Sequence, residues 1–245
     1  MIEKVNIPEI SQKHLHGIKD LAVDDINKIL ELSNFFKLNN REKDKNYPIL
    51  KGRTIINLFF EPSTRTLISF EIAAKRLGAD VINMNIEGSS LRKGESLQDT
   101  AHTLGAMNPD LVVIRHGIDN ATKQVSEILS CPVINAGEGI NEHPTQALLD
   151  AYTITNNKRS LENITVSICG DLEHSRVARS NYYLLKKMKS NVRFVYPEFF
   201  KPKDLDKYEV ETFTNLEEGI TDADIVMMLR IQNERISDMK LPSKE

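Results

Sequence analysis

Short apolar segments rich in valine and isoleucine recur along this chain and alternate with longer segments of helical periodicity. Most of the apolar segments show little polar–apolar alternation, which is typical of strands buried on both faces of a parallel sheet. A repeated strand–helix–strand order favours the same arrangement. The segments predicted as strands are 54–60, 80–85, 110–116, 132–137, 164–170, 192–197, 208–213 and 224–230.

Five other segments have the pattern of amphipathic helices. Gly78 is placed to cap the end of one of them, Ser96 and Asp99 give another a capping-box-like start, and Pro144 fits the first turn of a third. Helices are therefore predicted at 22–40, 64–77, 96–107, 143–157 and 175–190.

A polar stretch at 155–163 divides the series into two halves. We therefore predict an α/β protein of two domains, each with a parallel β-sheet flanked by helices. The expected domains are residues 1–157 and residues 158–245. A chain of 245 residues has the length for two domains of ordinary size.

Composition excludes several classes of function. The net charge of −3 provides no basic field for nucleic acid or an anionic membrane, and apolar runs are too short to span a bilayer. The polar N-terminal segment does not resemble a secretory signal, so a cytoplasmic location is expected. Cys131 and Cys169 lie in separate apolar runs and are interpreted as buried, reduced thiols. Residue spacings give no sign of a metal site, and no organic cofactor is expected.

Polar residues follow most of the predicted strands, and many of them are cationic. In open α/β sheets, ligands bind at the carboxyl ends of the strands, so these residues are candidates for a shared site. The segments concerned include "EPSTRT" (61–66), "EGINEHPTQ" (138–146), "DLEHSRVAR" (171–179) and "RIQNER" (230–235).

The segment "STRT" combines a helix start with groups that bind anions. Ser63 is a suitable N-cap residue, and the backbone N–H groups of Thr64, Arg65 and Thr66 would then lack partners within the helix. A helix N-terminus of this kind binds phosphate readily, and an arginine fork adds to it. The alternative interpretation is an ordinary capped helix with a surface arginine.

Other candidate residues also suit an anionic ligand. Arg115 ends an apolar strand, where a charged residue needs a partner or a ligand. His143 and Gln146 lie one helical turn apart, although His143 could equally be a structural histidine. Arg230 and Gln232 alternate to the same side of a strand end. Further candidates are Lys93 in a loop, which could simply be solvated, and Arg176 at a helix start.

Other catalytic classes have weaker support. The chain lacks the glycine-rich signatures of P-loop and dinucleotide-binding proteins. No Ser-His-Asp or Cys-His set stands out, and no carboxylate pair is placed for acid–base work. The residues therefore predict a site that binds negative charge at several points, without a protein nucleophile.

Five motifs, in their order and spacing, resemble the aspartate carbamoyltransferase family over essentially the whole chain: "STRT" (63–66), "KGES" (93–96), "RHG" (115–117), "HPTQALLD" (143–150) and "MMLRIQ" (227–232). The first and fourth are shared with ornithine carbamoyltransferases. The lysine loop and the Arg-x-Gln motif at 230–232 resemble the aspartate branch.

The resemblance implies transfer of the carbamoyl group of carbamoyl phosphate to the α-amine of L-aspartate, in pyrimidine biosynthesis. It implies that Ser63, Thr64, Arg65 and Thr66 hold the phosphate, that Thr66, Arg115 and His143 surround the carbonyl oxygen, and that Gln146 holds the carbamoyl amide. Arg65, Thr66, Arg115 and His143 would be the catalytic residues. The aspartate carboxylates would be bound by Lys93, Arg176, Arg230 and Gln232.

The same resemblance implies shared active sites in a homotrimer. Ser89 and Lys93 would reach into the site of a neighbouring subunit. A regulatory or dihydroorotase partner chain is compatible with the family, whereas nucleic-acid and membrane partners are not expected.

One departure from the family pattern concerns the C-terminal part. Family chains continue beyond the point where this sequence ends, so the second domain is expected to be incomplete at its C-terminus. Two alternative functions follow: a non-catalytic truncated homologue that binds phosphate ligands or a partner chain, or a carbamoyltransferase for another amine such as ornithine. The clustered cations argue against a cationic acceptor.

Overall fold

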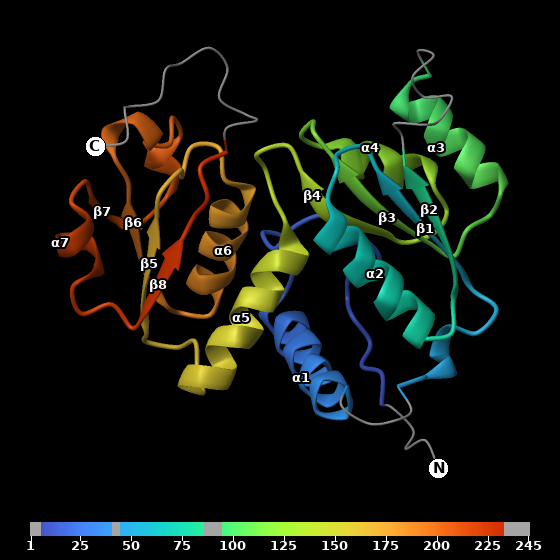
Figure 1. Ribbon diagram of the computed structural model, residues 1–245, viewed down its shortest axis with the longest axis horizontal. Helices are drawn as coiled ribbons and strands as arrows, with labels where there is room; N and C mark the ends of the chain where they lie inside the picture. Colours follow the sequence, from blue (N-terminus) through green and yellow to red (C-terminus); the bar gives the residue numbers. More distant parts are fainter. Residues whose placement is uncertain (1–5, 41–44, 86–94, 233–245) are drawn as a thin grey trace.

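The computed structural model describes residues 6–40, 45–85 and 95–232. Within them the chain forms two parallel four-stranded sheets that lie side by side, with helices packed against them (Figure 1). The predicted α/β class is confirmed.

The first sheet has the strand order β2–β1–β3–β4, and all its pairings are parallel. Its strands are β1 (Thr54–Phe59), β2 (Asp80–Asn85), β3 (Leu111–His116) and β4 (Val133–Glu138). Leu15 forms a parallel bridge to Ile134, so the N-terminal segment runs along the free edge of β4.

The second sheet has the order β7–β6–β5–β8 and is also parallel. Its strands are β5 (Thr165–Cys169), β6 (Asn191–Val195), β7 (Glu211–Phe213) and β8 (Ile225–Met228). All eight predicted strands are present, with ends that differ from the prediction by a few residues at most.

The five predicted helices are confirmed as α1 (Val23–Asn39), α2 (Thr64–Arg76), α3 (Leu97–Ala106), α5 (Pro144–Lys158) and α6 (Arg176–Lys187). The predicted capping box is present, because Ser96 Oγ accepts from the Asp99 N–H and Asp99 accepts from the Ser96 N–H. Helices that were not predicted are α4 (Ala121–Ile128), α7 (Leu216–Ile220) and the 3₁₀ turns Pro48–Leu50, Glu198–Phe200 and Leu205–Lys207.

Apolar side chains cover both faces of the first sheet. Ile56 and Leu58 face α3 and α4, whereas Ile55 and Phe59 face the side covered by α2. Adjacent strand residues point to opposite faces, so a strand buried on both sides is apolar at most consecutive positions. The polar exception in β1, Asn57, is fully buried and donates to Asn83 Oδ1 at 2.8 Å. This packing explains why β1 reads as "TIINLF" and not as an alternating sequence.

The largest apolar core joins α1 and α5 to α6 and the second sheet. Ala147 and Ile154 of α5 are buried in the same cluster as Leu184 of α6 and Ile168 of β5. In Figure 1 α5 and α6 lie between the two sheets. The packing of α5 on α6 therefore holds the two sheets together, while the domain division after residue 157 stays a prediction.

Strand β8 differs from the prediction of strands buried on both faces. Its residues alternate in exposure, and Val226 and Met228 are 43% and 63% exposed. Within the described residues β8 is an edge strand that pairs only with β5. The sequence suggested burial because both faces of β8 carry apolar side chains.

Each sheet contains one point where the strand order reverses. In the first sheet this point lies between β1 and β3, and in the second between β5 and β8. Chain segments leave such a pair of strands in opposite directions, which opens a crevice at their carboxyl ends. The residues that follow these four strands are therefore the best placed to form a site.

Candidate active site

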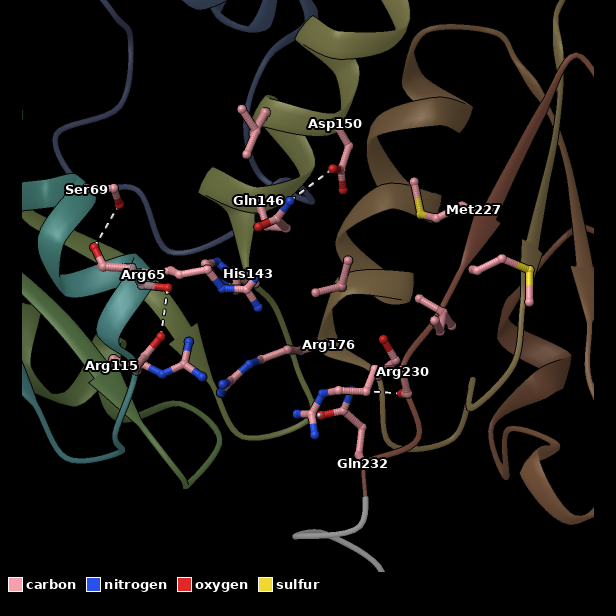
Figure 2. A pocket seen from close by; sticks show the side chains of 17 residues that line it. Arg65, Ser69, Arg115, His143, Gln146, Asp150, Arg176, Met227, Arg230 and Gln232 are labelled. Atoms are coloured by element: carbon pink, nitrogen blue, oxygen red, sulfur yellow. Dashed lines mark hydrogen bonds between the residues drawn. The ribbon is translucent and has the colours of Figure 1, made fainter. Parts of the chain in front are cut away.

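A pocket of about 620 Å³ lies between the carboxyl ends of the two sheets. It receives residues from the start of α2, the end of β3, the starts of α5 and α6, and the end of β8 (Figure 2). The sequence-predicted residues that line it are Ser63, Arg65, Thr66, Arg115, His143, Gln146, Arg176, Arg230 and Gln232.

Three predicted residues are not among the described residues that line the pocket. Thr64 begins α2 and is exposed outside the pocket. Ser89 and Lys93 lie outside the described residues. The predicted sharing of the site between subunits therefore stays a prediction.

The start of α2 presents backbone and side-chain donors near the pocket. Ser63 occupies the N-cap position, but its side chain makes no capping bond; its Oγ donates instead to Thr66 Oγ1 at 2.9 Å. The expected side-chain cap is thus wrong, although the expected helix start is correct. Because the first-turn N–H groups have no acceptor within a helix, they are available to an anion.

Arg115 of strand β3 and Arg176 at the start of helix α6 meet at the same carboxylate. Arg176 Nη2 donates to Glu61 Oε2 at 2.9 Å, and Arg115 Nε lies 3.5 Å from the same oxygen. Arg115 Nη1 also donates to the Ala136 carbonyl at 3.1 Å, and Arg176 Nη1 to the Gly139 carbonyl at 3.4 Å. Figure 2 shows the two guanidinium groups pointing toward one another.

Gly137 allows this close approach. Its φ is +110°, a region that favours glycine, and an added Cβ would lie 2.9 Å from Arg115 Nη1 and 3.0 Å from Arg176 Cζ. Both guanidinium groups therefore pack directly against the backbone at this position. Only 4% of the Arg176 side chain and 14% of the Arg115 side chain are exposed, so little water screens their charges.

Arg115 faces the pocket because successive side chains of a β-strand point to opposite sides. The next residue, His116, points to the other side, where its ring packs 4.5 Å from the ring of Phe60. Burial lowers the pKa of His116, while the negative charges of Glu61 and Glu138 raise it in part.

Helix α5 begins beside the pocket with a buried histidine. His143 is the N-cap residue, it is 8% exposed, and its N–H donates to Ser180 Oγ of α6 at 2.8 Å. Pro144 occupies the first helical position, as predicted. The backbone of His143 is thus held by the second sheet's helix while its side chain lines the pocket.

One turn further along α5, Gln146 Nε2 donates to Asp150 Oδ1 at 2.9 Å. Asp150 Oδ2 accepts a second bond from Asn181 Nδ2 of α6 at 2.8 Å. Burial raises the pKa of the Asp150 carboxyl, and the bonds from Asn181 and Gln146 lower it in part because they stabilise the charged form.

The end of β8 supplies the last pair of predicted residues. Arg230 Nη2 donates to Gln232 Oε1 at 3.0 Å, which confirms that the two side chains lie on the same side. The Gln232 N–H donates to Asp171 Oδ2 at 3.0 Å, and Asp171 is fully buried after β5. A buried carboxylate thus anchors this segment to the neighbouring strand end.

Glu61, Asp150 and Asp171 are the functional candidates that sequence reasoning missed. Each is acidic, whereas an anion-binding site is expected to consist of cationic residues. Glu61 stands two residues after the end of β1, Asp171 stands two residues after the end of β5, and Asp150 lies four residues after Gln146. All three stand at strand ends or at helical spacing from a predicted residue, so these positional criteria would have identified them if acidic residues had been included.

Within the described ranges, no group of three or more His, Cys, Asp or Glu side chains is arranged to hold a metal ion. Cys131 and Cys169 are both buried and free, as predicted, and burial raises the pKa of both thiols. In the same part of the chain no helix combines the length and apolarity that crossing a bilayer would need.

Known proteins resemble this chain in sequence and in structure. Residues 13–156 match the family model described as the carbamoyl-P binding domain of aspartate/ornithine carbamoyltransferase. The aspartate carbamoyltransferase catalytic subunit of Pelagibacter ubique is 53% identical over 244 residues, which cover 99% of this chain and 78% of that protein.

Two solved structures illustrate the structural similarity. Aspartate transcarbamoylase from Trypanosoma cruzi, in complex with carbamoyl phosphate and aspartate, superposes with a TM-score of 0.86 at 31% identity, covering 95% of this chain and 77% of that one. The catalytic subunit of M. jannaschii aspartate transcarbamoylase gives a TM-score of 0.80 at 36% identity, covering 93% and 76%. This chain belongs to the aspartate/ornithine carbamoyltransferase family, and within it to the aspartate carbamoyltransferase catalytic subunits.

Proposed function

We propose that this chain transfers the carbamoyl group of carbamoyl phosphate to the α-amine of L-aspartate, giving N-carbamoyl-L-aspartate and phosphate, as a step of pyrimidine biosynthesis. The observation that best supports this proposal is that Arg115 of β3 and Arg176 of α6 meet in one pocket, which the start of α2 also lines. Such a pocket brings two anionic substrates together, and the relatives named above catalyse a reaction between two such substrates.

The first sheet provides the carbamoyl phosphate site. Ser63, Thr64, Arg65 and Thr66 hold the phosphate at the start of α2. The exposed Arg65 side chain lines the pocket and is free to rotate onto a phosphate oxygen, where its fork donates two bonds. Gln146 binds the carbamoyl amide from the first turn of α5.

The second sheet provides most of the aspartate site. Arg176, Arg230 and Gln232 bind the two carboxylates, and Lys93 of a neighbouring subunit completes the set. Arg176 is already oriented by the carboxylate of Glu61 at 2.9 Å, a contact of the kind that a substrate carboxylate would make. The substrate then competes with Glu61 for this guanidinium group.

The reaction needs stabilisation of a developing oxyanion. The amine nitrogen of aspartate attacks the carbonyl carbon of carbamoyl phosphate, and its lone pair forms the new C–N bond. The carbonyl π electrons move to oxygen, where Thr66, Arg115 and His143 donate to the negative charge. One donor of this type contributes roughly 10²–10³ in rate.

The second half of the reaction releases phosphate. The carbonyl re-forms, the bond from carbon to the phosphate oxygen breaks, and phosphate leaves with the electron pair. The departing phosphate accepts the proton that the amine nitrogen loses, so the mechanism requires no protein base. Most of the remaining rate enhancement comes from holding two mutually repelling anions at reaction distance.

Aspartate is favoured over ornithine as the acceptor because the pocket is rich in cations. Among the described residues, Arg65, Arg115, Arg176 and Arg230 line it together with one carboxylate, that of Asp150. A cationic acceptor side chain would be repelled at the end of β8, where Arg230 lies.

The proposal is tested by incubating the 245-residue chain with carbamoyl phosphate and either L-aspartate or L-ornithine and measuring the carbamoylated product. Formation of carbamoyl aspartate that exceeds formation of citrulline supports it. Faster reaction with ornithine would reassign the acceptor. Phosphate binding without turnover on either amine would favour the non-catalytic homologue.

Assembly, domain division and location complete the proposal. We place the carbamoyl phosphate-binding domain at 1–157 and the aspartate-binding domain at 158–245, and we propose a homotrimer in which Ser89 and Lys93 enter a neighbouring site. A regulatory or dihydroorotase partner chain would bind to this trimer. The buried free thiols of Cys131 and Cys169 support a cytoplasmic location.

A further inference from the structure

The contact between Gln146 and Asp150 determines which end of the Gln146 amide faces the pocket. The two side chains are joined by one bond of 2.9 Å, from Gln146 Nε2 to Asp150 Oδ1. Figure 2 shows this bond and shows the Gln146 oxygen directed away from Asp150. Gln146 is half-buried at the pocket wall, so the orientation of its amide decides whether it offers an acceptor or a donor there.

The chemistry of Asp150 allows only one of the two orientations. An ionised carboxylate has acceptors and no donor, so its partner atom on Gln146 must be the nitrogen. The reverse orientation would bring two oxygens together. The Asp150 carboxylate therefore determines which atom of the Gln146 amide faces it, the nitrogen, and which atom faces away, the oxygen.

Asp150 is itself held in place from the second sheet's helix α6. Asn181 Nδ2 donates to Asp150 Oδ2 at 2.8 Å and also to the Val177 carbonyl at 3.0 Å. Two amide donors thus occupy both carboxylate oxygens. They stabilise the charged form against the burial that raises the Asp150 pKa.

We infer that Asp150 is a positioning residue that fixes the Gln146 amide with its oxygen in the pocket, and that this acceptor makes the site select carbamoyl phosphate over acetyl phosphate. This inference rests on the proposed function. The two phosphates are nearly isosteric, and they differ in one group: the carbamoyl –NH₂ donates hydrogen bonds, whereas the acetyl –CH₃ does not. An acceptor aimed at that group gains a bond from one ligand and stays unpaired with the other, which is the arrangement that discriminates best.

The test compares dissociation constants for carbamoyl phosphate, acetyl phosphate and inorganic phosphate, measured by calorimetry with freshly dissolved ligands at fixed salt. The parent chain is compared with Asp150→Asn and Asp150→Ala, which allow the Gln146 amide to flip so that its oxygen and nitrogen exchange places. Gln146→Leu removes the acceptor, and Asp206→Asn is a matched control for loss of an exposed negative charge. A double variant, Asp150→Asn with Gln146→Leu, completes a thermodynamic cycle.

The expected result is a loss of about tenfold in the preference for carbamoyl over acetyl phosphate in both Asp150 variants, with inorganic phosphate bound as before. Asp206→Asn keeps the parent preference. In the Gln146→Leu background, Asp150→Asn changes the preference no further, because Asp150 acts through Gln146.

Three results would overturn the inference. An unchanged preference in both Asp150 variants would show that the amide orientation is set elsewhere. An equal loss with and without Gln146 would show that Asp150 acts independently. A parallel loss of all three ligands would reduce Asp150 to a structural link between α5 and α6. A parent chain that binds neither carbamoyl phosphate nor inorganic phosphate would instead refute the proposed function, and this inference with it.

Discussion

Glu61 and Arg176, which are 115 residues apart in the chain, form the ion pair that joins the first sheet to the second at the pocket, with Oε2 and Nη2 separated by 2.9 Å. Arg115 shares the same carboxylate oxygen at 3.5 Å. One negative charge thus lies between two positive ones. The Glu61 carboxylate thus serves as an internal counter-ion that both guanidinium groups share.

Replacement of Glu61 by glutamine should destabilise the unliganded protein by about 1–3 kcal/mol, because two largely buried guanidinium groups lose their shared counter-charge. Inorganic phosphate should then recover more stability in Glu61→Gln than in the parent, since an external anion takes over the role. Urea unfolding with and without phosphate measures both effects. Equal stabilisation of parent and variant by phosphate would contradict the shared-anion interpretation.

Arg65→Ala should remove most of the activity and leave the fold intact, because the Arg65 side chain is exposed at the pocket. The matched control is Arg76→Ala, at the opposite end of α2, where the guanidinium group contacts Asn40. Initial rates at varied carbamoyl phosphate, together with circular dichroism, distinguish loss of substrate binding from unfolding. Near-normal turnover by Arg65→Ala would refute the phosphate assignment.

His143→Ala should lower kcat by roughly 10²-fold with a smaller change in the KM for carbamoyl phosphate, because the imidazole acts on charge that develops only in the transition state. The Ser180 contact uses the backbone N–H of residue 143 and survives the substitution. His102→Ala, on the exposed face of α3, serves as the control. A proportional rise in KM with unchanged kcat would assign His143 to ground-state binding instead.

Glu142 should make the stability of the fold depend on pH. Burial raises its pKa above the ordinary value of 4.5, although it accepts bonds from the Ile18 N–H, the Ser180 hydroxyl and the Lys19 N–H. A raised folded-state pKa means that the folded chain binds this proton more tightly than the unfolded chain. The stabilisation that this proton gives the fold is fully present below the pKa of Glu142 in the unfolded chain. It is lost as pH rises through the pKa of Glu142 in the folded chain.

The comparison variant for this effect is Glu142→Gln, which has no titrating group at the position. The free energy of unfolding of the variant, relative to the parent, should increase as pH rises from about 4 towards neutrality. Urea unfolding curves of both proteins at a series of pH values measure the difference, and all other titrating groups cancel in it. A difference that stays constant across this range would show that Glu142 ionises equally in both states.

Shared active sites can be tested by mixing two inactive variants. If Lys93 acts in a neighbouring subunit, then Arg65→Ala and Lys93→Ala carry defects that fall on different chains of one site. Trimers re-formed from a mixture of the two should contain some sites with neither defect and should regain a fraction of the parent activity. Mixing that restores nothing would place both residues in the site of the same chain.

The sequence predicted the elements well because most strands of the two sheets are apolar over most of their length; the exposed strand β7, Glu211–Phe213, is an exception. The burial of Ile55 and Ile56 on opposite faces of β1 is a direct consequence of that pattern. Helix α7 was missed because its five residues, Leu216–Ile220, are too few to show a helical period. Strand β8 was judged too buried, because apolar composition does not reveal that a strand lies at an edge.

The cationic half of the site was predicted from the sequence, whereas its acidic half was not. Arg115 was selected because a charged residue at the end of an apolar strand needs a partner or a ligand, and Arg176 and Arg230 were selected as cations at a helix start and a strand end. Asp150 contacts Gln146 one helical turn away on α5, so only its second contact, with Asn181 of α6, depends on how the helices pack. Which residues Glu61 contacts depends on how the two sheets pack. That packing involves contacts between distant parts of the chain, which no local pattern encodes.

The two reversals of strand order have a consequence for how the protein acquires its activity. The strands that form the pocket edges, β1, β3, β5 and β8, are spread through the chain, and the pocket exists only where their ends face one another. Each sheet can form from contacts within its own half, but the finished pocket must also bring together segments of high sequence separation, such as Glu61 and Arg176, which are 115 residues apart, and this is a slow kind of step. During refolding from denaturant, recovery of anion binding should therefore lag behind recovery of secondary structure. An anionic ligand should stabilise the chain only after the two sheets have docked.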